Sequence, residues 1–195
     1  MNFDRELVQI VDAAIAEAAR RSGPWLACRL GCNECCMGPF AITPLDVRRL
    51  RQGLAELDIR DPERAGRVRV RAKESVARIS REFPQDPVAT VLTVDGAMDQ
   101  EPCPALDPDT GGCDLYAARP ITCCTFGPAL RFGSEPDNES LAVCELCYHG
   151  ATDRQIANCA VDLDLRLEAE LLEQLARGSS AHADTLVAFA LAEAS

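Results

Sequence analysis

The chain has 195 residues, 47% of them hydrophobic, and a formal net charge of −11 at pH 7. A chain of this length can bury about 70% of its unfolded surface, so we expect a single domain over residues 1–195. The acidic balance disfavours nonspecific attraction to nucleic acid or anionic lipid, and no stretch approaches the ~20 apolar residues of a membrane span. The N-terminal segment has early acidic residues and lacks the apolar stretch of a secretory signal, which predicts a cytoplasmic protein.

Three helices are predicted in the first half of the chain. Apolar residues at three- and four-residue steps mark the first, over about residues 3–22. Thr43 offers an N-cap, with Pro44 at the first helical position and Asp46 in the capping-box place, which predicts a second helix to about residue 57. The sequence Asp61-Pro62-Glu63 repeats this signal and begins a third helix, to about residue 83.

The third predicted helix is strongly basic. Residues 60–81 contain eight Lys and Arg against three acidic residues. Such a face could bind phosphate or an acidic partner. However, no aromatic residues that would stack on bases interleave the charges. The favoured interpretation is therefore an exposed helix that balances an acidic body.

The second half of the chain is predicted to be less regular. β-Branched residues over Val88–Val94 predict a strand, whereas residues 101–128 are rich in Pro, Gly and Cys and predict little regular structure. Thr152 or Asp153 can cap a long helix that ends near residue 178, and residues 183–192 predict a last short helix. We expect a mainly α fold, with helices flanking two irregular cysteine-rich metal-binding segments and room for one small β-hairpin.

The eleven cysteines are the most informative residues, because ten of them come in groups. Four lie in the segment CRLGCNECC. The other six form three pairs: one pair flanks a Gly-rich turn, one is adjacent in sequence, and one has C-x2-C spacing. The grouped cysteines are Cys28, Cys32, Cys35, Cys36, Cys103, Cys113, Cys123, Cys124, Cys144 and Cys147. Cys159 stands alone among apolar helical residues, which indicates a packing role. An odd cysteine count and a reducing cytosol disfavour disulfides, so the grouping indicates a thiolate metal site.

The spacing leaves the metal open, because thiolates suit both zinc and iron–sulfur clusters. The chain has only two histidines, and His149 alone lies near a cysteine group. We interpret it as a surface or supporting residue, so the site is expected to be all or nearly all sulfur. In extended backbone, adjacent side chains such as Cys35 and Cys36 point to opposite faces. Two such pairs in one chain therefore favour a polynuclear or two-site centre, or a supporting role for one cysteine of each pair.

Three catalytic interpretations are weaker. The first three cysteines have the C-x3-C-x2-C spacing of radical S-adenosylmethionine enzymes, but Glu34 replaces the usual aromatic residue and no βα repeat follows. Cys144 and Cys147 could form a redox pair, but the βαβ context of such pairs is missing. Two histidines are too few to support a hydrolytic cysteine. The catalytic residues, if there are any, are unknown at this point.

The segment CRLGCNECC, followed by EPCPALD (101–107), GGCDLY (111–116) and RPITC (119–123), resembles the YkgJ-type cysteine-cluster family of zinc- or iron-chelating domains, the CxxCxxCC type. The resemblance covers about residues 28–126 and rests on four motifs in a fixed order. It implies thiolate ligands, namely Cys28, Cys32, Cys35, Cys36, Cys103, Cys113 and Cys123, completed by Cys144 or Cys147. The chain departs from the family at Cys124, where arginine is common.

Other residues of the same motifs have expected supporting roles. Tyr116, Arg119 and Pro120 match the family's Y-x2-R-P step, and Arg119 can offset excess thiolate charge. Gly111 permits the positive φ of a tight turn before Cys113. Tyr116 and Phe126 are interpreted as core packing. The metal-binding module is expected over about residues 24–150, followed by a helical extension over 151–195.

The expected function is that of a cytoplasmic protein that binds zinc or iron through an all-thiolate site, with the metal ion or cluster as its partner. A related module occurs in flagellin lysine-N-methylases, and this resemblance implies an iron–sulfur centre with some link to S-adenosylmethionine. The alternatives are therefore an iron–sulfur enzyme, or enzyme module, with redox or S-adenosylmethionine-linked chemistry, and a metal storage or delivery protein.

Overall fold

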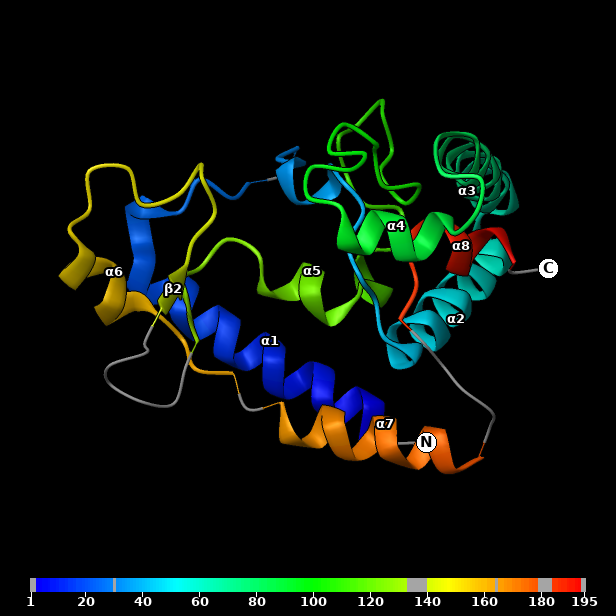
Figure 1. Ribbon diagram of the computed structural model, residues 1–195. Coiled ribbons are helices and arrows are strands. Elements are labelled where there is room, and N and C mark those ends of the chain that lie inside the picture. The colour runs from blue at the N-terminus through cyan, green and yellow to red at the C-terminus, as the bar shows by residue number, and fades with distance from the viewer. Residues whose placement is uncertain (1–2, 30, 133–139, 164, 179–183, 194–195) are drawn as a thin grey trace. The chain divides into compact units, whose positions relative to one another are not determined.

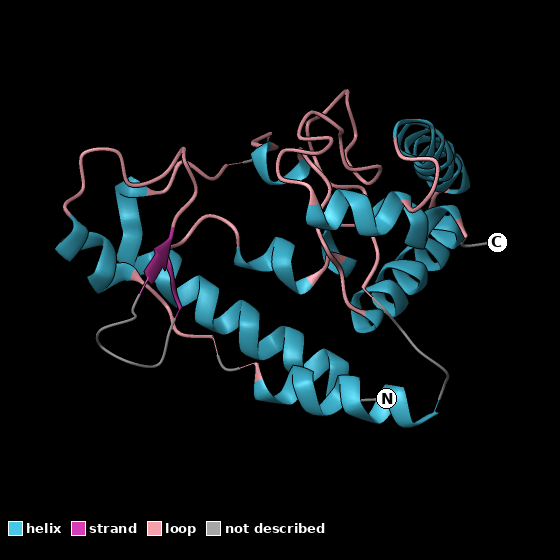
Figure 2. Cartoon of the chain, in the orientation of Figure 1, coloured by secondary structure: helices cyan, strands magenta, loops and turns pink. Residues whose placement is uncertain are grey.

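The structure is a computed structural model that describes residues 3–29, 31–132, 140–163, 165–178 and 184–193. The described chain is mainly helical and has one two-stranded antiparallel sheet (Figure 2), so the expected fold class is confirmed. The chain divides into two compact units. Unit 1 comprises residues 1–29 and 121–174, and unit 2 comprises residues 30–120 and 175–195. The single-domain organisation stays a prediction.

Unit 1 is organised around the N-terminal helix. α1 (Phe3–Ser22) contacts α5 (Ile121–Thr125) and α6 (Asp153–Cys159) (Figure 1). The short 3-10 helix η1 (Gly23–Trp25) follows α1, and β1 (Leu130–Phe132) pairs antiparallel with β2 (Ser140–Ala142). Most of α7 (Arg166–Gly178) also belongs to this unit. The buried residues of one cluster here are Ala129, Cys147, Tyr148, Cys159 and Ala160.

Unit 2 is a group of helices that carries irregular cysteine-bearing loops. α2 (Pro44–Arg60), α3 (Pro62–Glu82) and α8 (Val187–Ala192) contact one another, and α4 (Pro87–Thr93) contacts α3 (Figure 1). Two 3-10 helices, η2 (Glu34–Cys36) and η3 (Tyr116–Ala118), lie within the loops. The largest buried side chains of the shared core include Ile42, Leu50, Leu54, Val68 and Leu191. Cys103 and Cys113 pack against this core.

The capping signals of the sequence operate as predicted. The Thr43 side chain accepts a hydrogen bond from the Asp46 N–H, and the Asp46 carboxylate accepts one from the Thr43 N–H at 3.1 Å, so α2 begins with a complete capping box. Asp61 caps α3 by accepting from the Arg64 N–H at 3.0 Å. None of the described helices combines the length and apolar character that a membrane span requires.

The predicted strand over Val88–Val94 is wrong, because this segment forms α4. The Asp86 side chain accepts a hydrogen bond from the Ala89 N–H, and Pro87 occupies the first helical turn. An N-cap and a proline at the first position both favour helix. They outweigh the β-propensity of the branched residues that follow.

The single long helix predicted after Thr152 is also wrong, although its capping box is present. α6 ends at Cys159, and Ala160 is extended. Val161 then pairs with Leu130 of β1, which draws the chain away from helix. The last predicted helix is found as α8, while residue 183, its predicted start, lies outside the described residues. The short helix α5 lies within the region for which little regular structure was expected.

Gly53 allows η3 to lie against α2. A Cβ at Gly53 would clash with the Cβ of Ala118, which has no torsion through which to move away. We expect Gly53→Ala to reduce the free energy of unfolding by about 1–3 kcal/mol. Gly66 of α3 has no atom within 4 Å of the same position. Gly66→Ala is therefore expected to stabilise the protein by about 0.5–1 kcal/mol. Urea unfolding measures both, and a stabilising Gly53→Ala would contradict the contact.

Candidate metal centre

The first and second cysteine segments meet in unit 2. The Cys103 N–H donates to the Cys36 carbonyl at 2.7 Å, and the Gly38 N–H donates to the Glu101 carbonyl at 2.9 Å. Between these bonds, residues 37 and 102 form an antiparallel bridge. Two segments that are far apart in the sequence therefore run side by side, with a cysteine on each.

A tight turn brings Cys113 back beside Cys103. Leu106 and Cys113 form an antiparallel bridge, and the Asp114 N–H donates to the Ala105 carbonyl at 2.7 Å. The sequence between the two cysteines thus folds into a compact loop.

Glycines let this loop approach the first segment. Gly111 has φ +66°, as predicted for the turn, and a Cβ there would lie 3.2 Å from the carbonyl oxygen of Gly31. Gly31 directly precedes Cys32. The loop that carries Cys32 is therefore held against the turn that precedes Cys113.

The thiols of Cys35 and Cys36 hydrogen-bond to each other. This bond and burial raise the pKa of Cys35 well above its ordinary value. Both residues lie in η2, where the backbone is helical, so the extended backbone assumed from the sequence is wrong. Neighbouring side chains of a helical turn can lie close together, and this vicinal pair does.

Cys103 and Cys113 lie close enough to each other and to Cys35 for their charges to interact. Burial raises the pKa of Cys103 to about 12 and also raises the pKa of Cys113. The backbone of Ala105 and Leu106 hydrogen-bonds to the Cys103 sulfur, and the backbone of residue 115 to the Cys113 sulfur. N–H donors stabilise the thiolate over the thiol, so these bonds oppose the rise in pKa without cancelling it.

Arg119 supplies positive charge to the same thiols. Its guanidinium counteracts the rise in pKa at Cys35 and Cys113, as expected from the sequence. The guanidinium carbon lies 4.2 Å from the ring centroid of Tyr116, a cation–π contact. Tyr116 is 63% exposed and Phe126 is 44% exposed. The expectation that these two aromatic residues are core packing is therefore wrong.

Arginines of α3 hold the loop between Cys103 and Cys113. Arg64 and Arg71 both pair with the carboxylate of Asp114, whose side chain is only 1% exposed. Arg71 bonds to Asp114 at 2.5 Å and also donates to the Pro104 carbonyl at 2.8 Å. Arg71 therefore fixes the residue after each of the two cysteines.

A third arginine, Arg78, donates to both carboxylate oxygens of the buried Glu101, the shorter bond being 2.8 Å. The arginines at 64, 71 and 78 recur every seven residues, two helical turns, and so lie on one face of α3. Three of the basic residues predicted to lie on an exposed helix therefore pair with buried carboxylates of the same unit. Sequence analysis missed this face, and its signal was the seven-residue spacing together with the acidic residues beside the cysteines.

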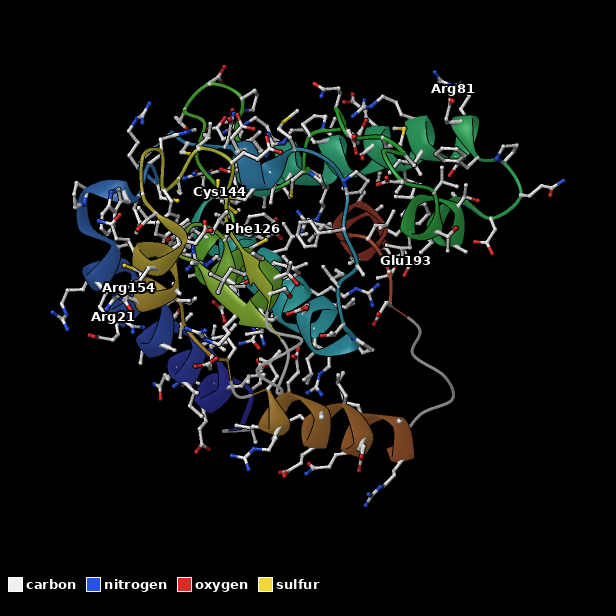
Figure 3. All side chains as sticks on the ribbon, turned by 60° about the vertical axis from the view of Figure 1, so that its left-hand side comes forward. Arg21, Arg81, Phe126, Cys144, Arg154 and Glu193 are labelled. Carbon is white, nitrogen blue, oxygen red and sulfur yellow. The ribbon has the colours of Figure 1, made fainter. Side chains whose placement is uncertain are left out.

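The remaining cysteines belong to unit 1. The Ala27 N–H donates to the Cys147 sulfur at 3.4 Å, and the Tyr148 N–H donates to the Trp25 carbonyl at 2.8 Å. Cys144 lies on the loop after β2 (Figure 3), and its carbonyl accepts from the Cys147 N–H at 2.9 Å. The residues just before Cys28 therefore run beside the C-x2-C step.

Cys28 is exposed, and its sulfur lies close to the backbone of Gly127. This glycine has φ +109°, and a Cβ there would lie 2.6 Å from the Cys28 sulfur. Cys123 and Cys124 lie on α5, so the extended backbone assumed for this pair is wrong as well. Cys159 is buried, and its thiol donates to the Arg21 carbonyl at 3.4 Å.

The predicted ligands are divided between the two units. Unit 2 has Cys32, Cys35, Cys36, Cys103 and Cys113, and unit 1 has Cys28, Cys123, Cys144 and Cys147. Within the described ranges, the structure has no group of three or more His, Cys, Asp or Glu side chains poised to hold a metal ion. The described residues also contain no disulfide. The ligand set therefore stays a prediction, while His149 is exposed, as interpreted from the sequence.

The family follows from a match that spans both cysteine segments. A family model described as "CxxCxxCC: Putative zinc- or iron-chelating domain" matches residues 27–148, more than half of the chain. The chain belongs to this family. Comparisons with curated proteins and with solved structures found no match. The CxxCxxCC domain thus includes the two paired segments of unit 2, the C-x2-C motif of Cys144 and Cys147, and the loop between Cys103 and Cys113 that bonds to α3.

Tyr148, which sequence analysis missed, fixes the backbone beside Cys147. It is a bulky residue at φ +60°, a conformation that costs free energy outside glycine. Its buried hydroxyl lies 2.6 Å from the Ser22 hydroxyl and accepts from the Ala129 N–H at 2.9 Å. These long-range bonds hold the strained position, and no local sequence pattern indicates them.

We expect Tyr148→Phe to reduce the free energy of unfolding by about 1–3 kcal/mol, since it leaves the buried Ala129 N–H without its acceptor. The measurement is chemical denaturation of the metal-free protein. Tyr116→Phe is the matched control, because its ring is exposed, and is expected to change stability by less than about 0.5 kcal/mol. Equal effects of the two substitutions would contradict the role of the Tyr148 hydroxyl.

Proposed function

We propose that this protein chelates zinc or iron through an all-thiolate centre. Its main proposed ligands are Cys35, Cys36, Cys103 and Cys113. The observation that carries the proposal is the hydrogen bond between the backbones of Cys36 and Cys103, which aligns the two cysteine segments. The remaining proposed ligands are Cys28, Cys32, Cys123, Cys144 and Cys147.

The surroundings of these sulfurs suit thiolates bound to a cation. Backbone N–H groups reach Cys103 and Cys113, and Arg119 adds a positive charge near Cys35 and Cys113. Hydrogen bonds and nearby charge disperse the excess negative charge of a multi-thiolate centre. Histidine is scarce, which favours sulfur-only ligation. A bound metal would cross-link the loops, and iron would add redox chemistry.

The number of proposed ligands favours an iron–sulfur cluster or a two-metal centre as the finer form of this proposal. A mononuclear tetrahedral ion takes four ligands, fewer than the cysteines proposed here. We also propose a cytoplasmic location, because a reducing compartment keeps such thiols available for metal.

Anaerobic purification followed by metal analysis tests the proposal. Iron with acid-labile sulfide and broad visible absorbance would identify a cluster, and colourless protein with stoichiometric zinc would identify a zinc centre. Metal-bound protein with every coordination position filled by sulfur supports a structural role, while an open position supports catalysis or metal delivery. Freshly purified, reduced protein that holds neither metal would overturn the proposal.

Metal binding is expected to release protons. Burial raises the pKa of Cys103 to about 12 and raises that of Cys113, so both are thiols at neutral pH in the metal-free protein. Because a metal binds the thiolate, affinity should rise with pH, about tenfold per unit for each proton displaced. Competition titrations with a chromophoric chelator between about pH 6 and about pH 8 measure this slope. An affinity independent of pH would contradict thiol ligation.

A further inference from the structure

A small cavity lies beside Cys103 in unit 2. It is bounded by α3, by α8, by residues 38–40 and by residues 101–104. Its volume is ≈ 20 Å³. One water molecule needs about 10–15 Å³ of such volume. The cavity is therefore large enough to hold one water molecule.

One polar atom of the cavity wall lacks a partner. Ser75 of α3 is 1% exposed, and its hydroxyl oxygen is the buried side-chain atom, among those the structure describes, that has no hydrogen bond. A buried hydroxyl without a partner is unfavourable. A serine in a helix can relieve this by bonding to the carbonyl four residues earlier, and Ser22 does so with Ala18 at 2.7 Å.

Ser75 is held in place by its neighbours on the same face of α3. Arg71, one turn before it, is bonded to Pro104, and Arg78, one turn after it, is bonded to Glu101. Both contacts fasten this stretch of helix to the segment that carries Cys103. These contacts keep Ser75 at the wall of the cavity that it lines.

We propose that the cavity binds one ordered water molecule, held by the Ser75 hydroxyl together with Glu101 and Cys103, which line the same space. Buried waters typically make about three hydrogen bonds. The Glu101 carboxylate has lone pairs beyond those that Arg78 uses, and a sulfur can accept one further weak bond. The water links α3 to the segment that carries Cys103.

Ser75→Ala tests the proposal through the sign of its effect. If water pairs with Ser75, alanine removes a satisfied hydroxyl, and the thermal midpoint of the full chain should fall by about 2–4 °C. If the hydroxyl has no partner, alanine removes an unfavourable group and the midpoint rises. Ser22→Ala is the control, because it loses bonds to Ala18 and Tyr148 and must lower the midpoint.

Crystallography of the full chain supplies the direct measurement. The expected result is a water peak within hydrogen-bond distance of the Ser75 oxygen that is absent from the Ser75→Ala variant. A cavity without such a peak overturns the proposal, and so does a raised or unchanged midpoint in the alanine variant. Neither measurement requires the metal, so the failure of this proposal is distinct from the failure of metal chelation.

Discussion

Replacing Cys103 by serine is expected to lower metal affinity by more than about 100-fold, the largest effect of any single substitution that we predict. The substitution replaces the thiolate of a proposed ligand with a neutral hydroxyl, and even the loss of a residue that only supports a ligand typically costs 10–100-fold. The Cys103 sulfur also receives two backbone hydrogen bonds. Metal analysis after anaerobic purification, followed by chelator competition, measures the loss.

Cys159→Ser is the matched control for this experiment. Cys159 is buried, and its thiol donates to the Arg21 carbonyl, a bond that a serine hydroxyl can also make. We expect this variant to keep its metal. Equal metal loss in the two variants would mean that the ligand assignment is wrong and that occupancy simply follows the stability of the fold.

Arg71→Met is expected to reduce the free energy of unfolding by about 2–3 kcal/mol. The side chain of Asp114 is 1% exposed, and after the substitution Arg64 is the arginine of α3 that still pairs with it. The Pro104 carbonyl also loses the hydrogen bond from Arg71. The expected loss of stability is smaller than the full cost of breaking a buried ion pair, because Arg64 still pairs with Asp114 and Arg71 is partly exposed. Denaturation of chelator-treated protein measures the effect.

The same substitution should also weaken metal binding, because Pro104 and Asp114 directly follow Cys103 and Cys113. Arg67→Met on the same helix is the control. Its partner Glu63 is exposed at the surface, and such pairs contribute at most about 1 kcal/mol. Should both substitutions leave metal affinity unchanged, the arginine face of α3 would have no part in organising the site.

Local signals in the sequence were sufficient for the elements that depend on neighbouring residues. The capping box at Thr43 and the N-caps at Asp61 and Thr152 are all present. Asp86 and Pro87 carry the same kind of signal for α4, within a run of β-branched residues that by itself favours a strand. The end of α6 could not be found in this way, because it depends on a distant partner, the pairing of Val161 with β1.

The candidate site shows the same division. The cysteine groups, the turn at Gly111 and the charge of Arg119 could be predicted from spacing and residue type. The partners of Arg71 and Arg78 lie far along the chain, and the buried bonds of Tyr148 reach α1. Such contacts form only once the helices have packed, so patterns among neighbouring residues in the sequence do not predict them.

The place of α8 in the chain has a consequence for biosynthesis. This helix contacts α2 and α3, and Leu186 and Leu191 are fully buried, yet it is translated after every cysteine. Because domains fold as units during synthesis, unit 2 cannot close its core while the nascent chain lacks α8. Until then Cys103 and Cys113 lack part of the core that they pack against, so we expect metal binding to follow the synthesis of α8.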